Sequence, residues 1–232
     1  MADLVLVLEA SAGSGSLALL RGERCVAHVQ VPMRGHDGER MMPALVEMLR
    51  ESGVSTADLA RIVCGAGPGG FTSLRIAAAI AKGLACSLGG ELWAVSSLAL
   101  VAAGTFDVAQ RAAGGGEVIA VLDALRGEWY SQRFAVAADG GIQAMEAPTL
   151  RDREALEAER QRGGGARIVG VGADTFADGT TAVPRAEDVS RLAPGPLLFP
   201  VDLERWEPEY GRLAEAQVKW EQAHGRALGA VG

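Results

Sequence analysis

The stretch that decides the fold is GAGPGGFTSLR, residues 65–75, which lies between a short apolar run and an alanine-rich helix. Two glycine patterns of nucleotide-binding loops overlap in it. Gly65, Gly67 and Gly70 match the GxGxxG spacing of dinucleotide sites, and the first and last of them also match a P-loop. Phe71 stands where a P-loop needs the lysine that neutralises the terminal phosphates, so the P-loop interpretation fails.

The dinucleotide interpretation needs an acid about 20 positions later, at the C-terminal end of the next strand, to hold a ribose hydroxyl. Glu91 has about that separation, but it begins the expected strand ELWAV instead of ending it. Its carboxylate should therefore lie at the wrong edge of the sheet. A typical dinucleotide site is therefore excluded.

The remaining interpretation of the loop is mechanical. The glycines and Pro68 make a tight turn from a strand at 61–64 into a helix at 71–88, and Thr72 or Ser73 caps that helix. A helix N-terminus of this kind can still hold an anion through its free amides. We favour a structural turn over a phosphate cradle.

The composition describes a globular chain that is acidic. It has 232 residues, 49% of them hydrophobic, and a net charge of −7 with only two lysines, Lys82 and Lys219. Affinity for a nucleic-acid backbone comes from neutralised phosphates, and the chain has no basic patch with interleaved aromatics. We therefore expect contact with nucleic acid to be indirect at most.

Three cysteines, Cys25, Cys64 and Cys86, lie in apolar surroundings without a CxxC pair. We expect buried free thiols in a reducing cytoplasm. The acidic N-terminus is a poor signal peptide, and no run reaches the ~20 apolar residues of a membrane span. The expected location is the cytoplasm, with no membrane partner.

The order of expected elements repeats once along the chain. The first half should contain strands at 4–8, 16–20 and 25–31, a helix at 39–51, the glycine-loop unit, a strand at 92–95 and a helix at 98–110. After Gly114-Gly115-Gly116 the pattern begins again, with strands at 118–122, 128–137 and from 141, a helix at 152–161, a strand at 167–170, a helical turn near Asp174 and a closing helix at about 208–224.

This repetition predicts an α/β fold of two lobes, 1–113 and 114–232, with duplicated mixed sheets flanked by helices. Each half begins with a strand that ends on an acid, then a turn and two further strands. The lobes of the actin-like ATPase (RNase H-like, ASKHA) fold begin in the same order. The first lobe should carry the partner-binding helices. The closing helix at 208–224 could pack back on the first lobe.

Glu9 and Asp123 end the first strand of each half, where an actin-like ATPase has acids that serve metal and nucleotide. Either the two acids serve metal and nucleotide, or they are solvated acids at strand ends. Gly67, Gly69 and Gly70 are the nucleotide candidates that would join them. The three histidines form no His-x-x-x-His pair, and no Gly-x-Ser-x-Gly is present. We expect no catalytic residue, no metal ligand and no cofactor.

The two helices of the first half carry more apolar surface than a single sheet-facing stripe requires. In the first, Met41, Leu45 and Met48 form one stripe, and a second lies beside it, made of Met42, Val46 and Leu49. In the other, Ala77, Ala81 and Ala85 recur at helical spacing and would let a helix approach closely. Either both helices only pack on the sheet and on each other, or their outer faces form a helical interface. The candidate interface comprises Met41, Met42, Leu45, Val46, Leu49, Phe71, Leu74, Arg75, Ala78 and Lys82.

With these residues in view, the chain resembles the TsaB (YeaZ) family of tRNA threonylcarbamoyladenosine biosynthesis. The most specific match is GPGGFTSLRIAAAIAKGLA, residues 67–85. Residues 34–53, the dipeptide Asp123-Ala124 and residues 207–221 support it. The resemblance covers most of the chain.

The resemblance implies a degenerate actin-like subunit without catalysis. Such a protein pairs through its two N-terminal helices with TsaD, which transfers the threonylcarbamoyl group to adenosine 37 of tRNAs reading ANN codons. A heterodimer or heterotetramer with a TsaD-like subunit is therefore expected, joined by a TsaE-like ATPase, with a homodimer through the same face when the protein is alone. The threonylcarbamoyl-adenylate comes from TsaC or its relative.

The chain departs from the family pattern at three places. Glu9-Ala10-Ser11 replaces aspartate-threonine-serine, which weakens a nucleotide role. In His36-Asp37-Gly38-Glu39 and Asp123-Ala124-Leu125-Arg126, an acid and an arginine are each displaced by one position. The leading hypothesis is a non-catalytic scaffold. A weak nucleotide-binding protein or ATPase is the alternative, and a peptidase is disfavoured because the sequence has no recognisable nucleophile or metal site.

Overall fold

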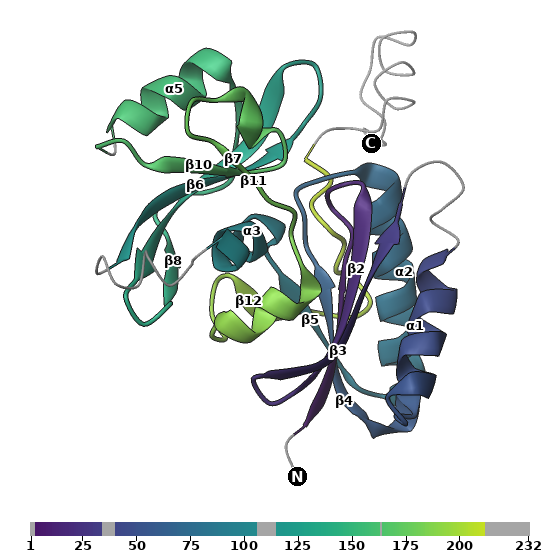
Figure 1. Cartoon of the computed structure of the whole chain (residues 1–232). Helices are drawn as coiled ribbons and strands as arrows, with labels where there is room; N and C mark the ends of the chain where they lie inside the picture. Colours follow the sequence, from purple (N-terminus) through teal and green to yellow (C-terminus); the bar gives the residue numbers. More distant parts are fainter. Residues whose placement is uncertain (1–2, 34–39, 106–114, 163, 212–232) are drawn as a thin grey trace, which may run out of the picture.

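The computed structural model describes residues 3–33, 40–105, 115–162 and 164–211. The expected helix at 208–224, the end of the helix expected at 98–110, and His36 and His224 lie largely or wholly outside these residues. Within the described ranges the chain forms two six-stranded mixed β-sheets, with helices on their faces (Figure 1).

The first sheet opens with the antiparallel meander that the sequence predicts. Strands β1 (Leu4–Glu9), β2 (Ser14–Arg21) and β3 (Arg24–Pro32) pair in turn. Parallel strands β4 (Leu59–Gly65) and β5 (Glu91–Val95) then extend the sheet beyond β1. A short strand, β12 (Leu198–Pro200), pairs antiparallel with β5 and gives the order β12-β5-β4-β1-β2-β3.

The second sheet repeats this plan. It has the order β11-β10-β6-β7-β8, in which β6, β7 and β8 are the antiparallel meander and β10 and β11 run parallel to β6. The predicted duplication of mixed sheets is confirmed. The strands are β6 (Gly115–Asp123), β7 (Glu128–Ala137), β8 (Ile142–Ala144), β9 (Thr149–Asp152), which pairs with β7, β10 (Arg167–Gly170) and β11 (Thr180–Thr181).

A short internal repeat marks the corresponding strands. The tetrapeptide Ala-Arg-Ile-Val occurs at 60–63 in β4 and again at 166–169 around β10, and both strands lie beside the first strand of their sheet. In both copies a glycine-containing loop follows. The sequence pattern predicts both of these strands, and the repeated tetrapeptide adds a second sign of the duplication.

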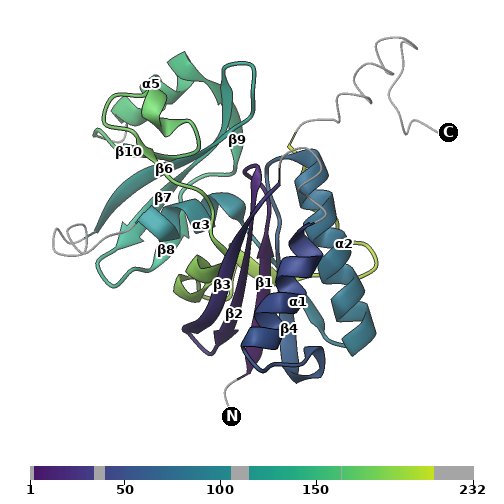
Figure 2. The ribbon, with the colours of Figure 1, turned by 45° about the vertical axis from the view of Figure 1, so that its right-hand side comes forward.

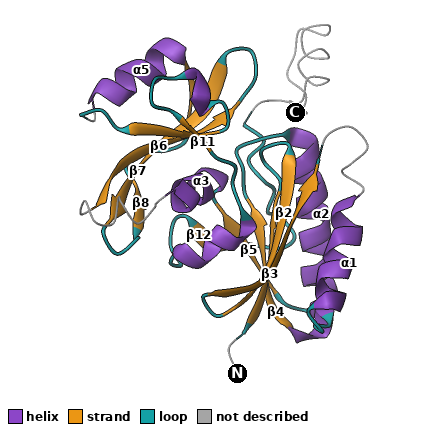
Figure 3. Ribbon diagram, in the orientation of Figure 1, coloured by secondary structure: helices purple, strands orange, loops and turns teal. Residues whose placement is uncertain are grey.

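The helices lie in three places (Figures 1 and 3). α1 (Met41–Glu51) and α2 (Phe71–Leu88) cover one face of the first sheet and lie side by side in both ribbon views (Figure 2). α5 (Arg153–Arg162) covers the second sheet. α3 (Ser97–Thr105) lies between the sheets, where residues 98–103 are fully buried in a core shared with β1, β4, β6 and β7. The described residues also contain the short 3-10 helices η2 (Thr56–Asp58), η3 (Ala173–Thr175) and η4 (Ala186–Arg191).

The alternation of side chains along β1 determines what each face of the first sheet receives. Leu4, Leu6 and Leu8 enter the core beneath α1 and α2, whereas Val7 enters the core around α3. Because successive strand residues point to opposite faces, Glu9 points to the same side as Val7. The acid at the end of β1 therefore faces α3.

The second lobe ends earlier than expected. The assignment of 114–232 to that lobe needs correction, because β12 pairs in the first sheet and η4 packs on β2 and β3. Beyond β12 the chain crosses α2: the Trp206 carbonyl accepts a hydrogen bond from Lys82 Nζ at 2.7 Å. The Glu209 amide then donates to the Ala66 carbonyl at 2.7 Å. We call residues 201–211 the C-terminal strap.

Among the described residues, α2 is long and apolar enough to cross a membrane by length and composition alone. Its fully buried alanines, Ala77, Ala81 and Ala85, pack in the core of the first sheet, as the alanines of a core helix do. The expectation of three buried thiols is only partly met. Cys64 is buried, Cys25 is half-buried, and Cys86 is exposed on α2.

Candidate functional site

The glycine loop uses its backbone amides within the protein. Ala66 N donates to the Val95 carbonyl at 2.7 Å, Gly67 N to Ser97 Oγ at 3.2 Å, and Gly70 N to the Ser11 carbonyl at 2.8 Å. A phosphate cradle needs such amides free and convergent. In this loop they fasten β4 to β5, α3 and the β1–β2 turn. The structural-turn interpretation accounts for these contacts.

At two positions of the loop only glycine fits, because another backbone segment passes close by. Gly67 has a left-handed φ of +83°, and a Cβ there would lie 2.2 Å from the Glu209 carbonyl oxygen of the C-terminal strap. A Cβ on Gly69 would lie 2.5 Å from the Ser11 carbonyl oxygen. No side chain fits at either position.

The predicted helix start needs one correction. α2 spans Phe71–Leu88 as expected, but its N-cap is Gly70, which has no side-chain cap. Ser73 Oγ donates to the Gly70 carbonyl at 3.1 Å, and Thr72 is exposed within the first turn, so neither residue caps the helix. Instead the first turn is positioned by the backbone contacts of the loop.

Glu9 is fully buried, so of the two alternatives for this strand-end acid the solvated one does not apply. Its Oε1 accepts a hydrogen bond from Ser11 N at 2.6 Å, and its Oε2 accepts one from Ser97 Oγ at 2.8 Å. Burial raises the pKa of the carboxyl, and the hydrogen bonds from Ser11 and Ser97 partly offset this. A Cβ on Gly65 would lie 2.1 Å from Oε2, so Gly65 leaves the space that Glu9 fills.

Ser97 is the residue of this site that the sequence analysis missed. Its hydroxyl joins the Glu9 carboxylate to Gly67 N, and its own amide donates to the Gly67 carbonyl at 3.1 Å. A serine pair before an apolar helix is a common start signal, and this signal at Ser96-Ser97 could have suggested a hydrogen-bonding role. Its pairing with Glu9, 88 positions away, depends on the tertiary fold.

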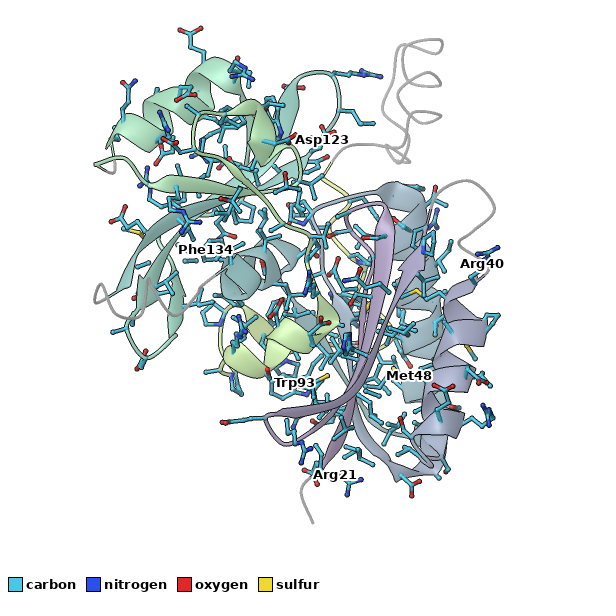
Figure 4. The ribbon with its side chains drawn as sticks, in the orientation of Figure 1. Arg21, Arg40, Met48, Trp93, Asp123 and Phe134 are labelled. Carbon is cyan, nitrogen blue, oxygen red and sulfur yellow. The ribbon has the colours of Figure 1, made fainter. Side chains whose placement is uncertain are left out.

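Asp123 stands at the corresponding end of β6 and behaves differently. It is exposed, and its Oδ1 accepts a hydrogen bond from Leu125 N at 2.8 Å in the β6–β7 turn (Figure 4). Leu125, Arg126 and Gly127 all have positive φ in this turn. One acid is therefore locked in the core and the other is turned to solvent, so the two do not form a matched pair of metal ligands.

Two further expectations about nucleotide sites can be compared with the structure. Glu91 is confirmed at the start of β5, opposite Arg61, whereas Gly65 pairs with Val95 at the other end of these parallel strands. Glu91 thus lies at the sheet edge away from the loop. Within the described ranges, no group of three or more His, Cys, Asp and Glu side chains is arranged to hold a metal ion.

The candidate interface on α1 and α2 divides into buried and exposed residues. Five of its ten residues lie in the core and cannot present a surface, because α1 and α2 turn them toward the sheet; these are Met41, Leu45, Leu49, Leu74 and Ala78. Met42 and Val46 are 45% and 55% exposed, a high value for large apolar side chains. The second stripe of α1 is thus reduced to these two.

The remaining three candidates lie along α2 beside the C-terminal strap. The Arg75 guanidinium lies 5.0 Å from the centre of the Phe71 ring, and that ring lies 4.7 Å from Tyr210. Lys82 is held by the Trp206 carbonyl. Besides Arg75, the exposed positions of α2 carry small side chains. Thr72, Ala79, Gly83 and Cys86 follow helical spacing, and Ser87 is exposed beside the last of them. This small-residue stripe replaces the buried alanines as the surface that a second helix could approach.

Comparisons with known proteins agree with this architecture. A family model described as TsaD, tRNA N6-adenosine threonylcarbamoyltransferase, matches residues 31–157. The chain is 30% identical to the tRNA threonylcarbamoyladenosine biosynthesis protein TsaB of Escherichia coli, over 82% of this chain and 85% of that protein. It is 29% identical to TsaB of Bacillus subtilis, over 93% of this chain and 97% of that protein.

Solved structures give the same result. YeaZ from Pseudomonas aeruginosa superposes with a TM-score of 0.68 at 25% identity, covering 89% of this chain and 98% of that one. A structure described as an uncharacterized protein with similarity to peptidase YeaZ from Pseudomonas aeruginosa gives 0.70 at 27% identity, with 90% and 100% covered. Sequence and structure together show that the chain belongs to the TsaB (YeaZ) family, within the broader group that the TsaD model matches.

Proposed function

We propose that this protein is a non-catalytic scaffold subunit in tRNA threonylcarbamoyladenosine biosynthesis. Its relatives carry that process in their names, and the family model that it matches is that of the transferase. The chain would hold a TsaD-like catalytic subunit in an active arrangement. It would contribute no catalytic group, and its contact with tRNA would be indirect.

The observation that carries the proposal is the outer face of the α1–α2 pair. Met42 and Val46 expose apolar surface on α1, and α2 exposes the small-residue stripe of Thr72, Ala79, Gly83 and Cys86. Large apolar side chains beside small ones allow a partner helix to pack closely and bury them. The same face would serve the homodimer of the isolated protein.

The second observation is the way Glu9 and the glycine loop are used. In an actin-like ATPase the strand-end acid serves metal and nucleotide. In this chain both carboxylate oxygens accept hydrogen bonds inside the core, and three loop amides are also taken. These contacts favour a structural role over the alternative of a weak ATPase.

Reconstitution tests the proposal. A TsaD-like subunit, a TsaE-like ATPase, a TsaC-like enzyme, ATP, threonine, bicarbonate and tRNA would be combined with and without this chain. We expect modified adenosine only when the chain is present. Modification at an equal rate without it would refute a scaffold role.

Calorimetry with ATP and magnesium addresses the alternative. We expect no tight binding by the isolated protein. Tight binding that is lost in Asp123→Ala would support the ATPase alternative instead, because Asp123 is the acid that remains accessible to a ligand.

A further inference from the structure

A cavity of about 840 Å³ opens between the two lobes, at the end of the sheets away from the glycine loop. Its wall on the first sheet carries Val5, Val63 and Trp93. The end of α3, the β7–β8 turn and the segment after η4 close the other sides. Figure 4 shows Trp93 in the first lobe, well away from Asp123. Cavities of this size at domain junctions are where small ligands commonly bind.

Arg61 is the main polar group on the sheet wall. Its guanidinium lies 4.2 Å from the centre of the Trp93 ring, on the ring face. Its Nε is buried and makes no hydrogen bond, although it forms an ion pair with Glu91 Oε2 at 3.6 Å. The side chain is 35% exposed, so the planar fork of donors is fixed by stacking and still reaches the cavity.

A second arginine lines the same cavity from the opposite side. Arg191 is the last residue of η4, donates from Nη1 to the Ala103 carbonyl, and lies 3.5 Å from Asp188 Oδ1. Two acids also line the cavity, but both are at exposed turns. Asp139 accepts a hydrogen bond from Gly141 N at 2.8 Å in its own turn, and Glu23 is in the β2–β3 turn. The deeper walls are thus apolar, and each of the two arginines is paired with one acid, Arg61 with Glu91 and Arg191 with Asp188.

We propose that this cavity binds a small organic anion that has a flat apolar body and a carboxylate or phosphate group. Arg61 holds the anionic group through its planar fork, which suits both oxyanions. Val5, Val63 and Leu192 surround the apolar body. The proposal is independent of the scaffold role, because it uses neither the α1–α2 face nor the glycine loop.

The test uses 8-anilinonaphthalene-1-sulfonate as a fluorescent probe on the full chain at neutral pH, with benzoate and phenyl phosphate as competitors. Benzamide, the neutral counterpart of benzoate, measures the contribution of charge. Arg61→Gln removes the guanidinium that is proposed to bind the anionic group. Arg167→Gln is the matched control, because it is the arginine of the repeated Ala-Arg-Ile-Val in the second sheet and lies outside the cavity.

We expect the probe to bind at one saturable site. Benzoate or phenyl phosphate should displace it, and benzamide should not. Arg61→Gln should lower the affinity for the probe by about tenfold or more, because a charge-assisted hydrogen bond is lost. Arg167→Gln should leave that affinity unchanged. Ala193→Trp, at an exposed position on the rim, should block the cavity and also weaken binding. Unchanged affinity in Arg61→Gln, equal weakening in Arg167→Gln, or competition by benzamide would overturn the proposal.

Discussion

The carboxylate of Glu9 accepts a hydrogen bond from the hydroxyl of Ser97 at 2.8 Å, and this contact joins the end of β1 to the start of α3. The same hydroxyl accepts a hydrogen bond from the amide of Gly67, so the buried pair of Glu9 and Ser97 holds the glycine loop in place. A carboxylate that serves nucleotide in actin-like enzymes is used here to hold the framework. The loop in turn sets the start of α2, which carries half of the proposed partner face.

Removal of this carboxylate should therefore destabilise the whole chain. In Glu9→Ala, Ser11 N and Ser97 Oγ lose their acceptor inside the core, where an unpaired polar group costs about 1–3 kcal/mol. Urea unfolding should show a free energy of unfolding that is lower than that of the wild type by an amount within or above that range. Asp123→Ala, at the matching end of β6, is exposed and should change stability by less than about 1 kcal/mol. Equal effects of the two substitutions would argue against the structural role of Glu9.

Glycine substitutions distinguish a packed loop from an open helix position. Gly69→Ala places a Cβ 2.5 Å from the Ser11 carbonyl oxygen and should cost about 1–3 kcal/mol. Gly83→Ala is in α2, where a Cβ meets nothing within 4 Å, and should stabilise by up to about 1 kcal/mol through helix propensity. Thermal unfolding of both variants checks the opposite signs. A tolerated Gly69→Ala would mean that the loop can move away from the β1–β2 turn.

Asp188 should make stability depend on pH. Its side chain is 9% exposed, its Oδ2 has no hydrogen-bond partner, and burial raises its pKa to about 6 from 3.8, although Arg191 opposes this. The folded state thus binds the proton more tightly than the unfolded state. The favourable contribution is complete below about pH 4 and is lost as the pH rises through about 6.

Asp188→Asn mimics the protonated form and isolates this effect. At pH 8 the variant should be more stable than the wild type, by at most about 3 kcal/mol. That advantage should fall by about half at pH 5, because the wild-type carboxyl then takes up its proton. Unfolding free energies at the two pH values give the comparison. A difference that does not change with pH would refute the assignment.

Charged substitutions on α1 should separate folding from association. Leu45→Glu buries a charge at a position that is 1% exposed, and it should unfold the chain or lower its stability by several kcal/mol. Met42→Glu is on the exposed side, and its unfolding midpoint should stay close to that of the wild type. Circular dichroism on heating measures both. If Met42→Glu destabilised the chain as strongly, Met42 would belong to the core and not to a docking face.

The sequence predicted the architecture well because its periodicity is a local property. The meander, the strand–loop–helix unit at 59–88 and the repeated order all follow from patterns within a few residues. The return of β12 to the first sheet was missed because three residues carry no periodic signal. Pairing of such a short segment depends on where the whole chain brings it.

The candidate site was harder to predict, because burial is a tertiary property. Glu9 and Asp123 occupy equivalent positions in the pattern, yet α3 covers only the first. Likewise, the two stripes of α1 are equally apolar, and only docking on the sheet decides that Leu45 is inside and Met42 outside. The sequence identified the right helices but could not choose their outer faces.

The most direct test of the scaffold proposal is the affinity between this chain and a TsaD-like subunit, measured by isothermal titration calorimetry. We predict that Met42→Glu combined with Val46→Glu weakens binding by at least about a hundredfold, as loss of a buried apolar contact centre does. Met145→Glu, an exposed methionine of the second lobe, should bind like the wild type. Wild-type affinity in the folded double variant would contradict the account.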